Sequence, residues 1–276
     1  GTPKAGWGVV VGTPKAGWVT VPAGRRRGRG REARVRVDEV MRIAILKLSA
    51  LGDVIHALPV AHALRRHFPD AHLAWIVETR AAPLLDGHPD LDSVIPVDTR
   101  RWRILLRNPA GLKAVATELS SLIRRMRASR FDVAIDLQGL LKSGVLAALT
   151  GAPFRIGFGW RRCREPLSAC FTNYRVLPRA AAVHVVDQYL CLLEPLGVHE
   201  GSPVFHIPSS PPAERRIEEF LAEQGIKPRD RLVALNPGAG RAEKRWPLSH
   251  FRALADRLSV EAGARVLLLW GPGEEI

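Results

Sequence analysis

The sequence is poor in cysteine and has no long apolar run. Its three cysteines, Cys163, Cys170 and Cys191, are odd in number and show no CxxC spacing. This excludes a disulfide framework and a cysteine-based metal or redox motif, and it fits a reduced, cytosolic protein. The longest apolar runs, such as VLLLW near the end, are the length of a strand, far short of the ~18–20 residues of a membrane span.

Acidic residues are also scarce relative to basic ones. The 276 residues carry 41 Lys and Arg against 27 Asp and Glu, a net charge of +14, and 46% of them are hydrophobic. Such a chain is globular and long enough for one large domain or two ordinary ones. A basic surface suits nucleic acid, anionic lipid or a phosphorylated substrate, and charge alone does not choose between them.

The first 40 residues differ in composition from the rest. GTPKAGW occurs at 1–7 and again at 12–18, and nine Lys or Arg against three acids give this stretch +6 of the net charge. Gly, Arg and Pro dominate, so we expect 1–40 to be a disordered basic extension, or a stretch upstream of a true start at Met41. A basic arm for nucleic acid or a membrane is the alternative.

Beyond residue 40, short apolar runs alternate with helical patterns, which indicates an α/β fold with a parallel, helix-covered sheet. The predicted strands are 42–48, 72–77, 93–97, 132–137, 231–236 and 265–270, and the predicted helices are 54–68, 112–126 and 248–263. A proline cluster in 202–216 reads as a boundary. We therefore expect two Rossmann-like domains, 41–204 and 205–276. The second is short for a complete α/β layer and is expected to be incomplete.

The stretch KLSALGDVIHALP, 47–59, carries Asp53 at the turn from the first of these strands into a helix. Ligands of open α/β sheets bind beyond the carboxyl ends of the strands, so Asp53 is a candidate general base. Asp is also a favoured helix cap, and this interpretation stays open. The turn has no GxGxxG, which argues against a dinucleotide fingerprint.

The stretch NPGAGRAEKRWP, 236–247, lies between a predicted strand and a helix. Gly238 and Gly240 free the backbone to approach an anion, and Lys244 and Arg245 suit a diphosphate at a helix N-terminus. A solvated basic loop is the alternative.

Two further segments carry candidate ligand groups. Near the end, WGPGEEI places Glu274 and Glu275 after a strand, where acids can hold ribose hydroxyls or cap a helix. The segments TRRWR, 99–103, and WRRCREPL, 160–167, suit anionic ligands, or form a solvated basic face. Gln138, in DLQGLLKS, comes at the end of a strand, and this segment either lines the same cleft or only turns the chain.

Taken together these motifs resemble those of the ADP-heptose:lipopolysaccharide heptosyltransferases, glycosyltransferase family 9. The resemblance is carried from Met41 onward by MRIAILKLSALGDVIHALP, WIVE, VIPVDTRRWR, FDVAIDLQGLLKS, GWRRCREPLSACF and EKRWP. The order RRWR, DLQGLLKS, REPL favours type I over type II. The resemblance implies a two-domain GT-B enzyme in which the first domain takes Kdo-lipid A and the second takes ADP-heptose. It also implies inverting transfer at the cytoplasmic face of the inner membrane.

The resemblance also implies roles for single residues. Asp53 would be the base, Lys244 would support the donor phosphates, and Glu274 with its neighbour Glu275 would hold the donor ribose. Gly238, Ala239 and Gly240 would offer backbone contacts to phosphate, and Lys47 and His56 would tune Asp53 or meet acceptor carboxylates. The residues expected to face the anionic acceptor are Arg100, Arg101, Arg103, Gln138 and Arg164.

No metal-ligand spacing is visible in the sequence, and the implied transfer needs no cofactor and no nucleic acid. The family's DTGxxHxA donor motif is absent from the chain. Three alternatives remain open at this point: a sister transferase with another sugar, an inactive fragment, and a nucleic-acid-binding protein that uses the basic arm.

Overall fold

The computed structural model describes residues 18–21, 33–36, 40–199, 202–239 and 242–270. The chain divides into two compact units, with the division between Pro208 and Ser209. This lies a few residues beyond the boundary that the proline cluster indicated. The units are described one at a time.

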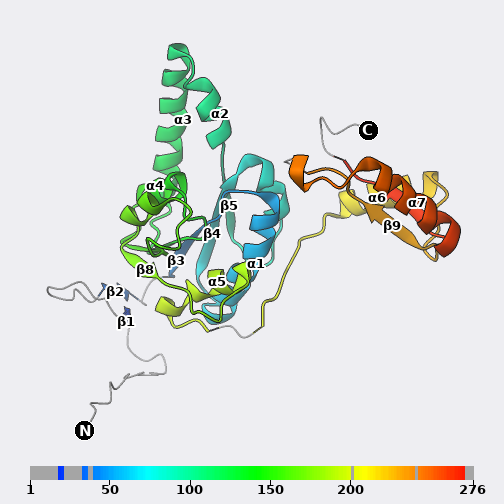
Figure 1. Ribbon diagram of the computed structural model, residues 1–276. Helices are drawn as coiled ribbons and strands as arrows, with labels where there is room; N and C mark the ends of the chain where they lie inside the picture. The colour runs from blue at the N-terminus through cyan, green and yellow to red at the C-terminus, as the bar shows by residue number, and fades with distance from the viewer. Residues whose placement is uncertain (1–17, 22–32, 37–39, 200–201, 240–241, 271–276) are drawn as a thin grey trace, which may run out of the picture. The chain divides into compact units, whose positions relative to one another are not determined.

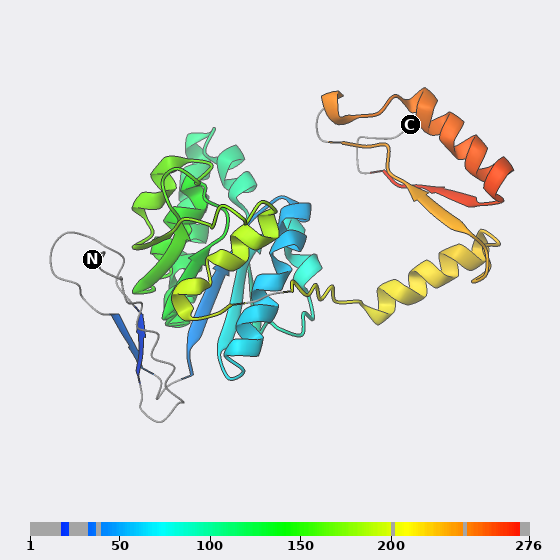
Figure 2. The ribbon, with the colours of Figure 1, turned by 60° about the horizontal axis from the view of Figure 1, so that its bottom comes forward.

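The first unit is built on a six-stranded parallel sheet (Figures 1 and 2) with the order β5-β4-β3-β6-β7-β8. Its strands are β3 (Arg42–Leu46), β4 (His72–Glu78), β5 (Ser93–Val97), β6 (Val133–Asp136), β7 (Phe154–Phe158) and β8 (Tyr174–Val176). The first strand of this sheet, β3, lies in the middle. β4 and β5 follow on one side of it, and β6, β7 and β8 then follow on the other side. This places the point where the strand order reverses between β3 and β6.

Alternate residues of the central strand enter two different cores. Ile43 and Ile45 pack in the core that contains α1 (Leu51–His67) and α5 (Val185–Cys191). Ala44 and Leu46 pack in the core that contains α3 (Pro109–Ala128) and α4 (Leu141–Leu149). A parallel sheet buried on both faces needs apolar side chains at successive positions, which is what the run RIAIL supplies.

The long helices of this unit carry clear start and stop signals. In α1, Asp53 lies in the first turn and Arg65, Arg66 and His67 lie in the last, so the charges oppose the helix dipole at both ends. In α3, the side chain of Asn108 accepts a hydrogen bond from the amide of Ala110 at 3.0 Å and Pro109 occupies the first turn. These signals explain why both helices begin within a few residues of the predicted positions.

All six predicted strands are confirmed, as are the three predicted helices. The expectation of a parallel, helix-covered sheet is confirmed with them. The sequence did not predict β7 and β8, because FRIGF is interrupted by Arg155 and Gly157 and YRV is three residues long. Gly157 is needed there, since a Cβ would lie 2.7 Å from Cγ2 of Thr172.

The second unit contains a two-stranded parallel sheet of β9 (Leu232–Leu235) and β10 (Arg265–Leu268), joined by α7 (Leu248–Ala262). Gly263 ends α7 with a φ of 59°, as its position in the sequence predicted. The preceding helix α6 (Pro211–Glu223) begins inside the stretch that the prolines marked as a linker. Prolines at a helix start are compatible with helix, because the first turn leaves its amides unbonded.

Two short segments of the basic N-terminal stretch also form a regular element. Strands β1 (Trp18–Val21) and β2 (Ala33–Arg36) pair in an antiparallel two-stranded sheet. The interpretation of residues 1–40 as a disordered extension did not anticipate this pairing. The rest of that stretch, including most of the GTPKAGW repeat, lies outside the described residues.

The close contact between the first turn of α3 and the end of α2 (Thr99–Leu105) gives a test of the fold. A Cβ on Gly111 would lie 2.2 Å from the backbone oxygen of Leu105, so Gly111→Ala must displace the end of α2. We expect a loss of about 1–3 kcal/mol in the free energy of unfolding, measured by urea titration followed by circular dichroism. Gly52→Ala is the control, because nothing lies within 4 Å of its Cβ position. Equal midpoints for the two variants would contradict this packing.

Candidate active site

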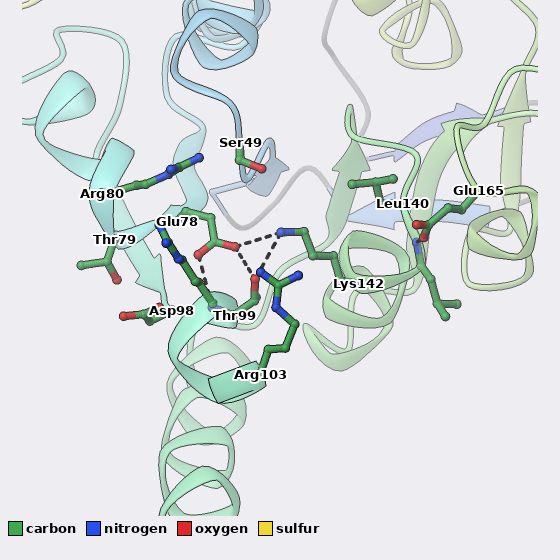
Figure 3. Close-up of a pocket in the computed structure, with 12 residues that line it drawn as sticks. Ser49, Glu78, Thr79, Arg80, Asp98, Thr99, Arg103, Leu140, Lys142 and Glu165 are labelled. Carbon is green, nitrogen blue, oxygen red and sulfur yellow. Dashed lines mark hydrogen bonds and ion pairs between the residues drawn. The ribbon is translucent and has the colours of Figure 1, made fainter. Parts of the chain in front are cut away.

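A cavity of about 900 Å³ opens at the carboxyl edge of the first unit's sheet (Figure 3). Its walls come from the segments that follow β3, β4, β5, β6 and β7. The lining residues are Ser49, Glu78, Thr79, Arg80, Asp98, Thr99, Arg100, Arg103, Leu140, Leu141, Lys142 and Glu165. This edge is where open α/β sheets bind their ligands.

One wall of the cavity is held by a buried polar network. Nζ of Lys142 lies 2.9 Å from Oε1 of Glu78, and the hydroxyl of Thr99 donates to the same oxygen. The amide of Thr99 donates to the other oxygen of Glu78 at 3.2 Å (Figure 3). Because Thr99 is the first residue of α2, this network fixes the start of that helix against the end of β4.

The other acidic side chains of the cavity accept hydrogen bonds from backbone amides, whereas two arginine side chains form no ion pair with any described residue. Asp98 accepts a hydrogen bond from the amide of Arg101, and Glu165 accepts one from the amide of Leu141. Within the described residues, the guanidinium groups of Arg100 and Arg103 form no ion pair, so both are available to an anionic ligand. Arg101 does not line the cavity and instead pairs with Glu118 of α3 at 3.1 Å. The structure thus brings Arg100 and Arg103 to the cavity and leaves Arg101 outside it.

Asp53 lies beside this cavity, in the first turn of α1. One of its oxygens accepts a hydrogen bond from the amide of Ala50 at 3.2 Å, and Nη1 of Arg164 lies 3.9 Å from the same oxygen. The side chain stays 35% exposed. Asp53 itself does not line the cavity. Two lining residues lie near it along the chain or through a contact: Ser49 precedes Asp53 by four residues, and Glu165 follows Arg164. The capping and the general-base interpretations are therefore compatible, because capping uses only one oxygen.

The loop that precedes Asp53 is held by Gln138. Its side-chain oxygen accepts hydrogen bonds from the amides of Leu48 and Ser49 at 3.0 and 3.2 Å, and its side chain is buried. Gln138 therefore does not face an acceptor, which corrects its placement among the acceptor-binding residues. Its role is to satisfy two backbone amides that would otherwise be buried without partners.

Lys47 is also buried, with 2% of its surface exposed. Its ammonium donates to the hydroxyl of Tyr189 at 2.6 Å and to the carbonyl of Leu137 at 3.3 Å. Burial lowers the pKa of Lys47 to about 8, against the opposing pull of the Asp53 and Asp136 carboxylates. Because its ammonium is buried, Lys47 does not contact a ligand at this edge and acts on Asp53 through its charge. Of the two roles considered for Lys47, tuning of Asp53 therefore fits the structure and contact with an acceptor carboxylate does not.

Asp136 ends β6 as a buried carboxyl group. It accepts hydrogen bonds from the amides of Gln138 and Gly139 and from the hydroxyl of Ser143, at 2.9, 3.2 and 3.0 Å. Burial nevertheless raises the pKa of Asp136 to about 6, and the three hydrogen bonds and the charge of Lys47 limit the rise. Asp136 and Lys47 together set the charge behind Asp53.

His56 lies in α1, three residues after Asp53, and does not line the cavity. Its ring meets that of His184 edge to face, with centroids 5.7 Å apart. His184 begins α5, where its side chain accepts a hydrogen bond from the amide of Val186. His56 thus contributes to the contact between α1 and α5, and the structure gives it no contact with Asp53.

In the second unit the predicted donor residues follow β9. Asn236 accepts a hydrogen bond from the amide of Gly238 at 3.1 Å, and Arg245 donates to the carbonyl of Ala239 at 2.9 Å, so the loop is folded on itself. Lys244 ends the turn η4 (Ala242–Lys244) and is exposed. The remaining predicted donor residues, Gly240, Glu274 and Glu275, lie outside the described residues.

Several residues of the site were not singled out from the sequence. Glu78, Thr99, Lys142 and Glu165 lay inside quoted motifs without a role, and Tyr189 lay outside every quoted motif. A usable signal was present for Glu78, which is a charged residue at the end of an otherwise apolar strand. Tyr189 gave no such signal, since it reaches Lys47 from 142 residues away.

Two Rossmann-like units, in which loops with basic residues follow the strands, are typical of a GT-B glycosyltransferase. The family model for glycosyltransferase family 9 (heptosyltransferase) matches residues 119–276. The chain is 30% identical over 236 residues to lipopolysaccharide heptosyltransferase 1 of Escherichia coli K12, covering 85% of this chain and 70% of the relative. With the enzyme of the same name from Pseudomonas aeruginosa it is 31% identical over 248 residues, covering 85% and 62%. The chain belongs to glycosyltransferase family 9.

Solved structures agree with this assignment. A glycosyl transferase family 9 protein from Veillonella parvula matches with a TM-score of 0.70 and 26% identity, over 84% of this chain and 63% of that one. E. coli heptosyltransferase WaaC with ADP-2-deoxy-2-fluoro heptose matches with a TM-score of 0.64 and 28% identity, over 84% and 70%. The chain thus spans roughly two thirds of the length of the proteins it resembles. The expectations of a GT-B fold and of membership in the heptosyltransferase family are confirmed.

The raised pKa of Asp136 predicts a pH dependence of stability. Its carboxyl group has a pKa of about 6 in the folded chain against 3.8 in the reference state, so ionisation opposes folding. Stability from this group is greatest below pH 4 and falls as the pH rises to about 6. Asp136→Asn removes the titration while its oxygen still accepts both amides. We expect its free energy of unfolding, relative to the native sequence, to rise across pH 4–7 by about 3 kcal/mol at most.

The measurement is urea unfolding of both proteins at several pH values between 4 and 7. Asp70→Asn is the control, because Asp70 is an exposed acid on the same unit. The control should give a constant difference from the native sequence over this range. A constant difference for Asp136→Asn as well would show that Asp136 is ionised at no cost.

Proposed function

We propose that this chain is a heptosyltransferase of type I, which transfers heptose from ADP-heptose to Kdo-lipid A with inversion at the anomeric carbon. The observation that carries the proposal is the partly exposed carboxylate of Asp53 beside a cavity lined by Arg100 and Arg103, which form no ion pair within the described residues. The relatives named lipopolysaccharide heptosyltransferase 1 from E. coli K12 and P. aeruginosa are 30 and 31% identical to the chain over 236 and 248 residues. One of the same name from Campylobacter coli is 24% identical over 136 residues, and one named lipopolysaccharide heptosyltransferase 3 is 24% identical over 226 residues. The type I relatives therefore support this specificity over that of the sister enzymes.

The acceptor's chemistry fits the cavity in the first unit. Kdo carries a carboxylate and lipid A carries phosphates, and guanidinium groups bind both through paired hydrogen bonds. Arg100 and Arg103 supply such groups from one wall, and Arg164, 68% exposed, supplies another next to Asp53. A cavity of about 900 Å³ has the size of pockets that hold small-molecule ligands.

In the proposed step Asp53 accepts the proton of an acceptor hydroxyl. The hydroxyl oxygen forms a bond to the anomeric carbon of heptose as the bond from that carbon to the diphosphate oxygen breaks. The bonding pair leaves with ADP, and the new proton stays on the Asp53 carboxyl until water removes it. The oxygen of Asp53 that is not bonded to Ala50 is the one free to act.

The donor belongs to the second unit in this proposal. Lys244 is exposed in the loop before α7, where its charge would stabilise the negative charge that develops on the leaving diphosphate. Gly238, Ala239 and Gly240 would offer backbone contacts to the phosphates, and Glu274 with Glu275 would hold the ribose. ADP-heptose is a substrate, and the proposed transfer uses neither a cofactor nor a metal.

The proposed acceptor is a lipid, so the enzyme would work at a membrane surface. Among the described residues, no helix is both long and apolar enough to cross a bilayer. Contact would then be peripheral, at the cytoplasmic face of the inner membrane, where a basic protein is attracted to anionic lipid. No nucleic acid takes part in this reaction.

The first test is release of ADP from ADP-heptose, measured with and without Kdo-lipid A. Since the chain spans 70% of the E. coli relative, it is assayed beside a chimera extended by the part of that relative beyond the match. We expect acceptor-dependent release, and a loss of 10²–10⁴-fold in kcat for Asp53→Ala because the base is gone.

The matched control is Asp187→Ala, because Asp187 occupies the same third position in the first turn of α5 as Asp53 does in α1. Both variants lose a similar helix-dipole contribution, so only Asp53→Ala should lose turnover. Equal rates in the two variants would make Asp53 a capping residue. Absence of acceptor-dependent release from the chimera would instead contradict the donor or the acceptor.

Arginine variants test the acceptor cavity. We expect Arg100→Ala with Arg103→Ala to raise the KM for Kdo-lipid A about tenfold or more, with a smaller change in kcat, because two charged hydrogen-bond donors are lost. The effect should shrink as salt is added. Arg101→Ala, in the same helix but paired with Glu118, is the control and should leave KM unchanged. A larger effect from Arg101→Ala would place the acceptor elsewhere.

A further inference from the structure

Two histidines and an aspartate from distant parts of the sequence meet in the first unit, in a cluster that the transfer reaction does not use. His62 lies in α1, Asp90 lies between η1 (Thr79–Leu85) and β5, and His206 lies in the segment 202–208 that ends the unit. Nδ1 of His62 is 3.3 Å and Nδ1 of His206 is 2.8 Å from the same oxygen, Oδ2 of Asp90. The cluster is defined by these three residues.

The spacing of these atoms suits a metal ion. The three ligand atoms all lie within 4.8 Å of one another. Zinc binds histidine nitrogen and carboxylate oxygen at about 2.0–2.2 Å, which places neighbouring ligands of a tetrahedral site roughly 3.4 Å apart. The distance from His62 to Asp90, 3.3 Å, already has this spacing, and the distance from His206 to Asp90, 2.8 Å, would have to open slightly. The two imidazoles, whose ligand atoms lie within 4.8 Å of each other, would move closer together.

Burial gives the cluster one closed side and one open side. The side chains of His62 and Asp90 are 16% and 8% exposed, and that of His206 is 38% exposed. A buried carboxylate with two imidazoles forms a fixed inner wall, and the open side leaves room for a water as fourth ligand. The rings of His62 and His206 also meet edge to face at 4.7 Å, which holds both imidazoles in place.

A third histidine, His88, supports the backbone of the cluster. Nδ1 of His88, which is buried, accepts a hydrogen bond from the amide of Asp90 at 3.2 Å. Residues behind a metal site commonly orient its ligands in this way, and their loss weakens metal binding 10–100-fold.

We propose that His62, Asp90 and His206 bind a divalent transition-metal ion of the Zn²⁺ class, with water as the fourth ligand. The ligand set of two imidazoles and one carboxylate has the intermediate softness that Zn²⁺ prefers over Mg²⁺ or Ca²⁺. To bind the ion, each imidazole would give its Nδ1 lone pair to the metal and carry its proton on Nε2.

The ion would fasten the end of the first unit to α1. The side chain of His206 ties 202–208 to the rest of the unit by its bond to Asp90 and by ring contacts with His62 and His88. Phe205 and Ile207 of this segment are 42% and 60% exposed, so apolar burial holds it weakly. Two metal–nitrogen bonds and one metal–oxygen bond across these elements would therefore strengthen this attachment.

The test is isothermal titration of the metal-stripped 276-residue chain with ZnCl₂. We expect one equivalent to bind, and affinity to fall at least 100-fold for His206→Ala and for Asp90→Asn. His206→Gln is a second variant that keeps the size of the side chain. His67→Ala, at the exposed end of the same helix α1, and His199→Ala, near the segment, are matched controls and should bind as the native chain does.

Two further readouts separate this site from other ligands. Co²⁺ in place of Zn²⁺ should give a visible spectrum typical of tetrahedral nitrogen and oxygen ligation, whereas a thiolate charge-transfer band would assign the ion to a cysteine and overturn the proposal. Zn²⁺ should slow protease cleavage within 199–208 in the native chain and not in His206→Ala. Absence of binding, or equal affinity in His206→Ala, would leave the cluster as a hydrogen-bonded contact only.

Discussion

The side chain of Gln138 accepts hydrogen bonds from the amides of Leu48 and Ser49, and the position of the candidate site at the carboxyl edge of the sheet depends on this junction. β3 is a central strand, and the chain that leaves it is buried at Leu48, whose amide has no water to bond, and partly buried at Ser49. β6 is the neighbour of β3, with Leu46 opposite Asp136, and the turn after β6 brings Gln138 to the amides. If these amides were unpaired, each would cost about 1–3 kcal/mol, and α1 would not begin where it does.

A second consequence of the same junction is electrostatic. Lys47 follows the last residue of β3, Asp136 is the last residue of β6, the two strand ends are paired, and both side chains are buried. Water screens neither of them, so each charge acts on the other and on Asp53 more strongly than surface charges would. The lowered pKa of Lys47 and the raised pKa of Asp136 record this environment. Asp53, which is partly exposed, stands between this charged interior and the solvent.

The sequence predicted the parts of the fold that are written in local pattern. Strands such as RIAIL and HLAWIV and helices with capping residues were recognisable, and parallel order followed from their alternation. It did not predict β8, whose three residues carry no period, or the pairing of β1 with β2. In the site, Asp53, Arg100 and Arg103 were singled out because they lie next to a strand end; Arg100 and Arg103 line the cavity, and the roles of all three stay predictions. Gln138 was found but given the wrong role, because a sequence does not show whether an amide points to a ligand or to backbone. The cluster of His62, Asp90 and His206 left no trace in spacing, since its members lie 28 and 116 residues apart.

Asp53 shows why a capping residue is a suitable place for a proposed base. A carboxylate on a free surface side chain samples several rotamers, and each must be given up before a proton can be transferred in a fixed direction. The bond from the amide of Ala50 to one oxygen of Asp53 has already selected an orientation, at a helix end that the fold requires in any case. The second oxygen is then held near the cavity without a further loss of entropy at the moment of reaction. The contact from Arg164, at 3.9 Å, is long enough to steady the carboxylate without closing this access. In this arrangement stability and the proposed chemistry use the same residue through different atoms.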